Sequence, residues 1–150
     1  MPVLDFLEGK GKDNSGSFIH DILAFDDAAL ERKHDFIQWL FPLPEPSRAQ
    51  PSSPVLTTDE IKAIRASSEA QANLGRATRR MMDFYQQNDH WLRSYDHNHL
   101  RITRIVRSLV VLKSRQAAQE FLSAIEGRVE AAGNPVNSDS RDYWRRASMA

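Results

Sequence analysis

The chain of 150 residues contains no cysteine. Disulfide bonds, thiolate nucleophiles and cysteine metal ligands are therefore excluded together, which fits a reducing compartment. Glycine is scarce as well, with six residues, half of them within the first 16 positions. No glycine-rich phosphate loop and no Gly-x-Ser-x-Gly turn occurs. The sequence thus offers no motif for a nucleotide cradle or for the common serine nucleophile.

Long apolar runs are also missing. No 18 apolar residues follow one another, and the N-terminus lacks the basic region and apolar run of a signal peptide. We therefore expect a soluble, cytoplasmic protein without membrane insertion. The 20 basic and 20 acidic residues leave no net charge, so no overall field steers the molecule to nucleic acid. Charge is nevertheless uneven, because residues 1–75 carry net −5 and residues 76–150 net +5.

No segment alternates apolar and polar residues with the period of a strand. Apolar residues instead repeat at intervals of three and four, which predicts an all-α fold, an irregular bundle of six to seven helices around a central buried helix. Residues 1–16 mix an apolar patch with glycines and are expected to form an N-terminal arm. Residues 17–150 are expected to form a single helical domain.

The central helix is expected to begin after a cap at Asp26 or Asp27 and to run to Phe41. Its last part is apolar on nearly every face, so other helices must bury it, with Trp39 in the core. Pro42 ends it, since proline disfavours helical geometry in the preceding residue.

A proline-rich connector follows the central helix. Five of the seven prolines lie between Pro42 and Pro54, which predicts extended backbone. Leu43, Val55 and Leu56 are expected to anchor this connector to the core.

The remaining helices are expected at residues 18–23, 58–66, 68–85, from 97 or 98 to 112, and 139–147, with one more from 115 to the stop at Gly133-Asn134-Pro135. Their predicted N-terminal caps are Ser17, Thr57 with Glu60, Ser67 or Ser68, and Ser114. Residues 86–98 form a polar loop in this scheme, with Trp91, Leu92 and Tyr95 as apolar anchors.

Two blocks of sequence carry a family resemblance. They read HDFIQWLFPL at residues 34–43 and NHLRITRIVRSL at residues 98–109. Both resemble signatures of the opioid growth factor receptor conserved region, a helical domain found alone in microbial proteins and at the front of a longer animal protein. The resemblance covers most of residues 26–126 and implies an interaction domain. The role that this resemblance brings from the longer animal protein is the binding of an enkephalin-type growth-inhibitory peptide.

The polar residues of these two blocks form the candidate ligand-binding site. They are His34, Gln38, Trp39, His99, Arg101 and Arg104. On helices, residues three or four apart project from one face, so adjacent helices could join these residues into a pocket with an indole wall. Such a pocket suits a carboxylate or phosphate, which arginine grips with two hydrogen bonds.

A structural role is the alternative for the same residues. Buried histidine and glutamine commonly bond loop carbonyls, and the arginines would then pair with the acidic first half of the chain. Against this, Arg101 and Arg104 lie at the start of a helix, where the helix dipole disfavours cations. We therefore expect them to bind an anionic group or a partner's carboxylate.

We accordingly expect a non-enzymatic domain that binds a peptide, a protein partner or a small anion, without cofactor or metal. None of the five histidines has the helical spacing of a metal site. One alternative is an enzyme of unknown reaction that uses His34 or His99 as acid or base. A second is nucleic-acid binding through the basic segment 76–115, which the core-like spacing of its aromatic residues disfavours.

Overall fold

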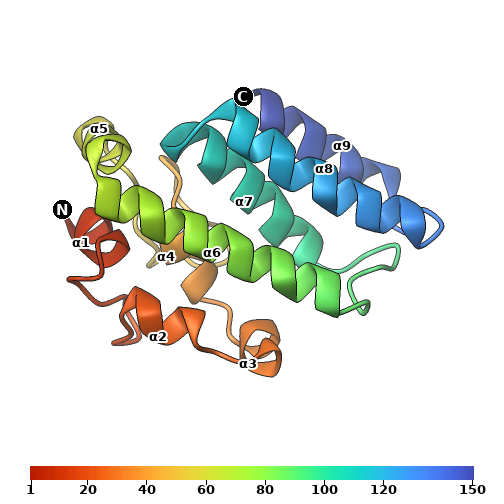
Figure 1. Cartoon of the computed structure of the whole chain (residues 1–150), viewed down its shortest axis with the longest axis horizontal. Coiled ribbons are helices and arrows are strands. Elements are labelled where there is room, and N and C mark those ends of the chain that lie inside the picture. The colour runs from red at the N-terminus through yellow and green to blue at the C-terminus, as the bar shows by residue number, and fades with distance from the viewer. The chain divides into compact units, whose positions relative to one another are not determined.

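The computed structural model describes all 150 residues, which form nine helices and no strand (Figure 1). The all-α prediction is confirmed, with nine helices in place of six to seven. They are α1 (Pro2–Leu7), α2 (Ile19–Leu23), α3 (Asp27–Arg32), α4 (Phe36–Leu40), α5 (Thr58–Ala66), α6 (Ser68–Gln87), α7 (His97–Leu112), α8 (Arg115–Ala131) and α9 (Ser138–Met149). None of them combines the length and apolar composition needed to cross a membrane.

The chain divides into two compact units, Met1–Ala77 and Thr78–Ala150, and α6 runs from the first into the second. The expectation that residues 17–150 make one domain stays a prediction. Each unit has its own apolar interior, described separately below.

In the first unit, the expected N-terminal arm contains a helix. Val3, Phe6 and Leu7 of α1 are fully buried. The carboxylate of the buried Glu60 accepts hydrogen bonds from the backbone N–H groups of Val3 at 3.0 Å and Leu4 at 3.3 Å. These are N–H groups that a helix cannot satisfy within its own first turn. The arm prediction missed α1 because its cap comes from a residue far along the chain.

The predicted central helix is interrupted, which corrects the expectation of one continuous helix. Asp26 caps α3 as predicted, accepting from the Ala29 N–H at 2.8 Å. Lys33 then adopts extended backbone, and α4 begins only after Asp35. The break has a physical reason, because all five residues of α4 are buried while Lys33 and His34 are exposed. A continuous helix would have carried these charged and polar side chains toward the core.

Most predicted caps are confirmed, but the capping box of Thr57 with Glu60 is not complete, because the Glu60 carboxylate bonds the N–H groups of α1. Thr57, Ser67 and Ser114 accept from the N–H groups of Glu60, Ala70 and Ala117 at 3.1, 3.1 and 3.0 Å. Ser17 is not a cap, because α2 starts after Phe18, whose N–H donates to Asp21 at 2.9 Å.

The connector after α4 is held at both ends by apolar side chains. Leu43 and Leu56 are buried, and the Leu56 N–H donates to the Leu43 carbonyl at 3.0 Å. Val55 forms an isolated parallel bridge with Leu43, but its side chain is exposed. Two of the three predicted anchors are therefore correct.

In the second unit, α7, α8 and α9 pack side by side (Figure 1). The predicted inner faces of α7 and α8 are buried except for Ala117, which is half-buried. The buried members are Ile102, Ile105, Val106, Leu109 and Leu112, and Ala118, Phe121, Leu122, Ile125 and Val129. After α8, Gly133 and Asn134 take positive φ angles of 86° and 57°, which end the helix and turn the chain toward α9. Trp144 anchors α9 and is fully buried.

Replacing Trp39 with alanine should lower the free energy of unfolding by about 3–5 kcal/mol, because a large buried side chain leaves a cavity. Trp39 is 7% exposed and packs edge-on against Phe6, with ring centroids 5.4 Å apart. Chemical denaturation of both proteins measures the difference. The control is Tyr143→Ala, which removes a ring that is 54% exposed and should change stability by about 0.5 kcal/mol or less. Equal losses in the two variants would contradict the core assignment.

Candidate functional site

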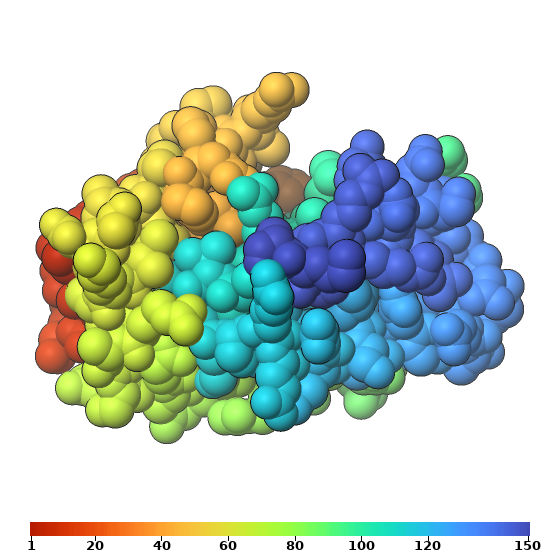
Figure 2. All heavy atoms as spheres, turned by 90° about the horizontal axis from the view of Figure 1, so that it is seen from above, coloured from red at the N-terminus to blue at the C-terminus, as the bar shows by residue number.

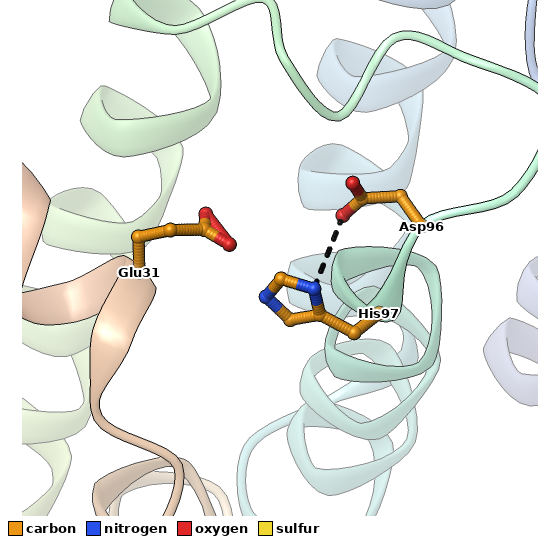
Figure 3. A group of neighbouring side chains, drawn as sticks. All are labelled: Glu31, Asp96 and His97. Atoms are coloured by element: carbon orange, nitrogen blue, oxygen red, sulfur yellow. Dashed lines mark ion pairs between the residues drawn. The ribbon is translucent and has the colours of Figure 1, made fainter.

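The start of α7 is fixed by Asp96. Its nearly buried carboxylate accepts from both the backbone and the side-chain amide of Asn98 at 2.9 Å and from Arg93 at 3.0 Å. Figure 3 shows its ion pair with His97, whose Nδ1 lies 3.7 Å from the carboxylate. Burial alone would raise the pKa of Asp96, but the two bonds from Asn98 and the charges of His97 and Arg93 lower it below its usual value. Asp96 is therefore an ionised cap at neutral pH.

Asn98 connects this cap to the preceding loop. Its side chain is fully buried, and its Oδ1 accepts from the Tyr85 hydroxyl at 3.2 Å. The indole Nε1 of Trp91 donates to the carbonyls of Tyr85 at 3.1 Å and Asn88 at 2.9 Å. Both ends of the loop between α6 and α7 are thus bound by buried side chains.

His99 links the loop to α9. Its Nε2 lies 2.9 Å from the Trp91 carbonyl, which can only accept, so Nε2 carries the hydrogen. The His99 backbone carbonyl accepts from Trp144 Nε1 at 2.9 Å, and the two rings meet edge-on. Burial lowers the pKa of His99, although the bond to Trp91 partly opposes this. The imidazole is therefore neutral at pH 7, and its Nδ1 is buried without a hydrogen-bond partner.

Three large side chains on or next to the helices of this network are exposed. Tyr95 and Leu100 are each 74% exposed and Tyr143 is 54% exposed. Tyr95 immediately precedes the Asp96 cap and Leu100 is the fourth residue of α7. These are the positions at which a hydrophobic staple brings two side chains together.

Tyr143 lies on α9, the helix that packs against α7. Leu100 and Tyr143 are the chain neighbours of His99 and Trp144, which are hydrogen-bonded to each other. Figure 2 shows α9 lying directly against α7. Arg141 and Arg145 of α9 pair with Glu130 and Glu126 of α8, so they mark the side of α9 that faces α8. Tyr143 lies roughly 160–200° around the helix axis from both arginines and therefore faces away from α8. We call Tyr95, Leu100 and Tyr143 the Leu100 surface.

The predicted site residues of the first unit have structural surroundings. Trp39 is in the core. The Gln38 amide lies against the carbonyls of His34 and Asp35, and it donates to them at 2.9 and 3.1 Å in the orientation that places its nitrogen on that side. His34 is exposed in the segment between α3 and α4. The prediction that His34 and Gln38 share a helix edge is wrong, since His34 precedes α4.

The predicted site residues of the second unit all lie on α7, but they are unequally accessible. His99 is 3% and Arg101 6% exposed, whereas Arg104 is half-buried. His99 bonds a loop carbonyl, as the structural alternative proposes. That the six residues meet in one ligand pocket stays a prediction.

The sequence analysis missed the Leu100 surface. It placed Tyr95 among the core anchors of the loop, where Trp91 is indeed fully buried, but Tyr95 is exposed. Two signals could have revealed this: Leu100 falls outside the apolar stripe of α7, and Tyr95 with Leu100 has staple spacing around an aspartate cap.

Comparison with known proteins gives a consistent result. The sequence model of the opioid growth factor receptor conserved region matches residues 12–90. Human opioid growth factor receptor is 39% identical over 160 aligned positions, covering 87% of this chain and 22% of the relative. The rat protein of the same name is 38% identical over 118 positions, covering 63% and 20%. Mouse opioid growth factor receptor-like protein 1 is 32% identical over 114 positions, covering 63% and 24%.

The chain thus spans about a fifth of the length of these relatives. No solved structure matches it.

We expect the stability of the protein to fall below about pH 6.5, the unperturbed value for histidine. The folded-state pKa of His99 is lowered, so the unfolded chain binds more protons and stability rises with pH. The His99 contribution is complete above the unfolded pKa and is lost as the pH falls below it. Denaturation midpoints measured between pH 4.5 and 7.5 test this.

His99→Gln should flatten that dependence, because no group at position 99 then titrates. His20→Gln removes an exposed imidazole of the first unit and serves as control. The lowered pKa of Asp96 acts in a different window, below about pH 4. An unchanged slope in His99→Gln would contradict the assignment.

Proposed function

The chain belongs to the opioid growth factor receptor conserved-region family, and we propose that it is a non-enzymatic domain that binds a peptide segment of a partner through the Leu100 surface. The observation that carries the proposal is the exposure of Tyr95, Leu100 and Tyr143, which lie next to the Asp96 cap, on α7 and on the adjoining α9. The name of the relatives, receptor, agrees with a peptide or protein partner.

The chemistry of these side chains supports binding. Tyrosine is enriched at protein interfaces, where its ring gives apolar contact area and its hydroxyl can bond. Single exposed apolar residues need no explanation, but several around one fixed element are typical of an interaction site. The backbone of α7 around Leu100 is fixed by the hydrogen bonds of Asn98 and His99, so little conformational entropy is lost when a partner binds.

The enzyme alternative has weaker support. A general acid or base must reach the proton that it transfers. His99 is buried, its Nε2 donates to a backbone carbonyl, and the ring is neutral. His34 is exposed in the segment before α4. His99 therefore lacks the access to a substrate proton that acid or base catalysis requires.

Nucleic-acid binding is also less well supported. Single-stranded nucleic acid needs exposed aromatic rings on which bases stack. In the basic segment 76–115, Phe84, Tyr85 and Trp91 are fully buried, so only Tyr95 of its aromatic residues offers a ring.

The test is a selection of peptides from a random display library on the wild-type protein, followed by fluorescence polarisation with the selected peptides. Leu100→Asp should weaken binding by about thirtyfold or more, as expected for a central interface residue worth roughly 2 kcal/mol. Leu100 is mostly exposed, so its replacement should leave the melting temperature nearly unchanged.

Met149→Asp is the matched control, because Met149 is equally apolar and 66% exposed but lies at the far end of α9. It should bind the selected peptides as the wild type does. Peptides that bind Leu100→Asp and wild type equally well would overturn the proposal.

A further inference from the structure

The helix α1 lies outside the part of the chain that the family's sequence model matches. That match begins at residue 12, whereas α1 spans Pro2–Leu7. The helix nevertheless buries three side chains completely, Val3, Phe6 and Leu7, which have the spacing i, i+3 and i+4 of one helix face. An isolated helix of six residues is not stable in water. Contacts with the matched residues 12–90 therefore keep α1 helical.

The apolar face of α1 packs on two helices of the first unit. Figure 1 shows α1 beside α5, and α1 also packs against α4. The Phe6 ring meets the Trp39 ring of α4 edge-on, with the ring centroids 5.4 Å apart. Trp39 belongs to the block at residues 34–43 that resembles a family signature. A residue of that signature thus forms part of the surface on which α1 lies.

Polar side chains bind both ends of α1. At its start, the Glu60 carboxylate accepts hydrogen bonds from two N–H groups of the first turn. At its end, Asn73 Nδ2 donates to the Leu7 carbonyl at 2.7 Å, and the Ser67 hydroxyl donates to the carboxylate of Glu8, the C-cap, at 2.6 Å. A helix leaves its terminal N–H and C=O groups without partners of its own. These contacts therefore fix the direction of the bound helix as well as its apolar face.

The residues that provide this ring contact and these hydrogen bonds all lie within the matched residues 12–90. They are Trp39, Glu60, Ser67 and Asn73, which we call the α1-binding surface. Glu60 is buried, and a buried acceptor that loses its donors is costly. When α1 leaves, this carboxylate therefore favours another helix whose first-turn N–H groups take the place of those of α1.

The connection after α1 favours its release as a unit. Gly9 and Gly11 follow the helix closely, and Gly9 has a φ of 82°. The chain is held again from Asp13, whose carboxylate is 8% exposed and accepts from the N–H groups of Ser15 and Ser17 at 2.9 Å. Terminal segments open at a lower free energy than the core. We therefore expect α1 to open together with the residues before Asp13, while the rest of the first unit stays folded.

We propose that the α1-binding surface is a docking site for a short amphipathic helix of a partner protein, and that α1 occupies it until the partner displaces it. The partner helix carries apolar side chains at i, i+3 and i+4, and its first-turn N–H groups bond Glu60. An apolar helix face laid on a complementary surface is a common mode of peptide recognition. All residues of this site belong to the first unit, whereas the Leu100 surface belongs to the second.

The experiment compares the full wild-type chain with its Phe6→Asp variant, in which a charge beside Trp39 releases α1. The probe is a fluorescent peptide that copies residues 1–12, and a scrambled peptide of the same composition is its control. With a released state populated at about 1% in the wild type, the copy should bind Phe6→Asp about a hundredfold more tightly in fluorescence polarisation. A third peptide, unrelated except for apolar side chains at i, i+3 and i+4, should show the same preference for Phe6→Asp. The scrambled peptide should bind neither protein.

A second substitution locates the bound peptide. Asn73→Ala in the Phe6→Asp chain should weaken binding of the copy by about three- to tenfold, because the bond to the Leu7 carbonyl is lost. Lys62→Ala removes an exposed side chain of α5 and should leave the affinity unchanged. Equal affinities in the Asn73→Ala and Lys62→Ala chains would contradict binding at this surface.

Hydrogen exchange of the wild type decides the question if Phe6→Asp does not fold. The amides of Val3 and Leu4 should exchange about a hundredfold or more faster than the amide of Leu74, a buried residue of α6. Exchange of all three amides at one rate would overturn the proposal, because α1 would then open only with the core.

Two further outcomes would also overturn it. One is a folded Phe6→Asp variant that binds the copy no better than the scrambled peptide. The other is a wild-type dimer, detected by analytical ultracentrifugation, that the copy dissociates. Such a dimer would assign the α1-binding surface to α1 of a second copy of the chain in place of a partner protein.

Discussion

The second unit depends on two consecutive residues, Asn98 and His99, which carry polar groups into its interior. Each bonds a segment outside its own helix: Asn98 bonds Tyr85 and Asp96, and His99 bonds the Trp91 carbonyl while its own carbonyl accepts from Trp144. A buried polar group without a partner costs about 1–3 kcal/mol, so these bonds hold the loop and α9 in one arrangement. The exposed residues nearby are positioned by bonds that they do not make themselves.

In the first unit, a buried carboxylate likewise bonds a segment outside its own helix. Glu60 lies in the first turn of α5, where its N–H donates to the Thr57 cap, yet its side chain reaches the first turn of α1. In a capping box, the glutamate would instead bond the N–H of its own cap residue. The helix dipole of α1 favours a negative charge at this point. One acidic residue thereby joins two helices that lie more than fifty residues apart in sequence.

Periodicity and capping residues were enough to predict the long helices, because a helix of four or five turns repeats its apolar stripe several times. The inner faces of α7 and α8 and the caps at Asp26, Thr57, Ser67 and Ser114 came from such local signals. The helix α1 and the break between α3 and α4 could not be found in this way. The helix α1 depends on the hydrogen bonds that its first turn makes with the distant Glu60. The break depends on Lys33 and His34, which stay exposed while every residue of α4 is buried.

The candidate site was harder to predict because polarity is a poor guide to accessibility. His99 and Arg101 drew attention as functional residues, and both are buried. Leu100 stands between them, and a single leucine between polar residues looks like a core position. On α7, however, consecutive residues lie about 100° apart around the axis, so buried neighbours on both sides do not bury Leu100. The signature on this one helix therefore holds residues of two kinds: His99 and Arg101 are buried in the fold, and Leu100 between them is exposed.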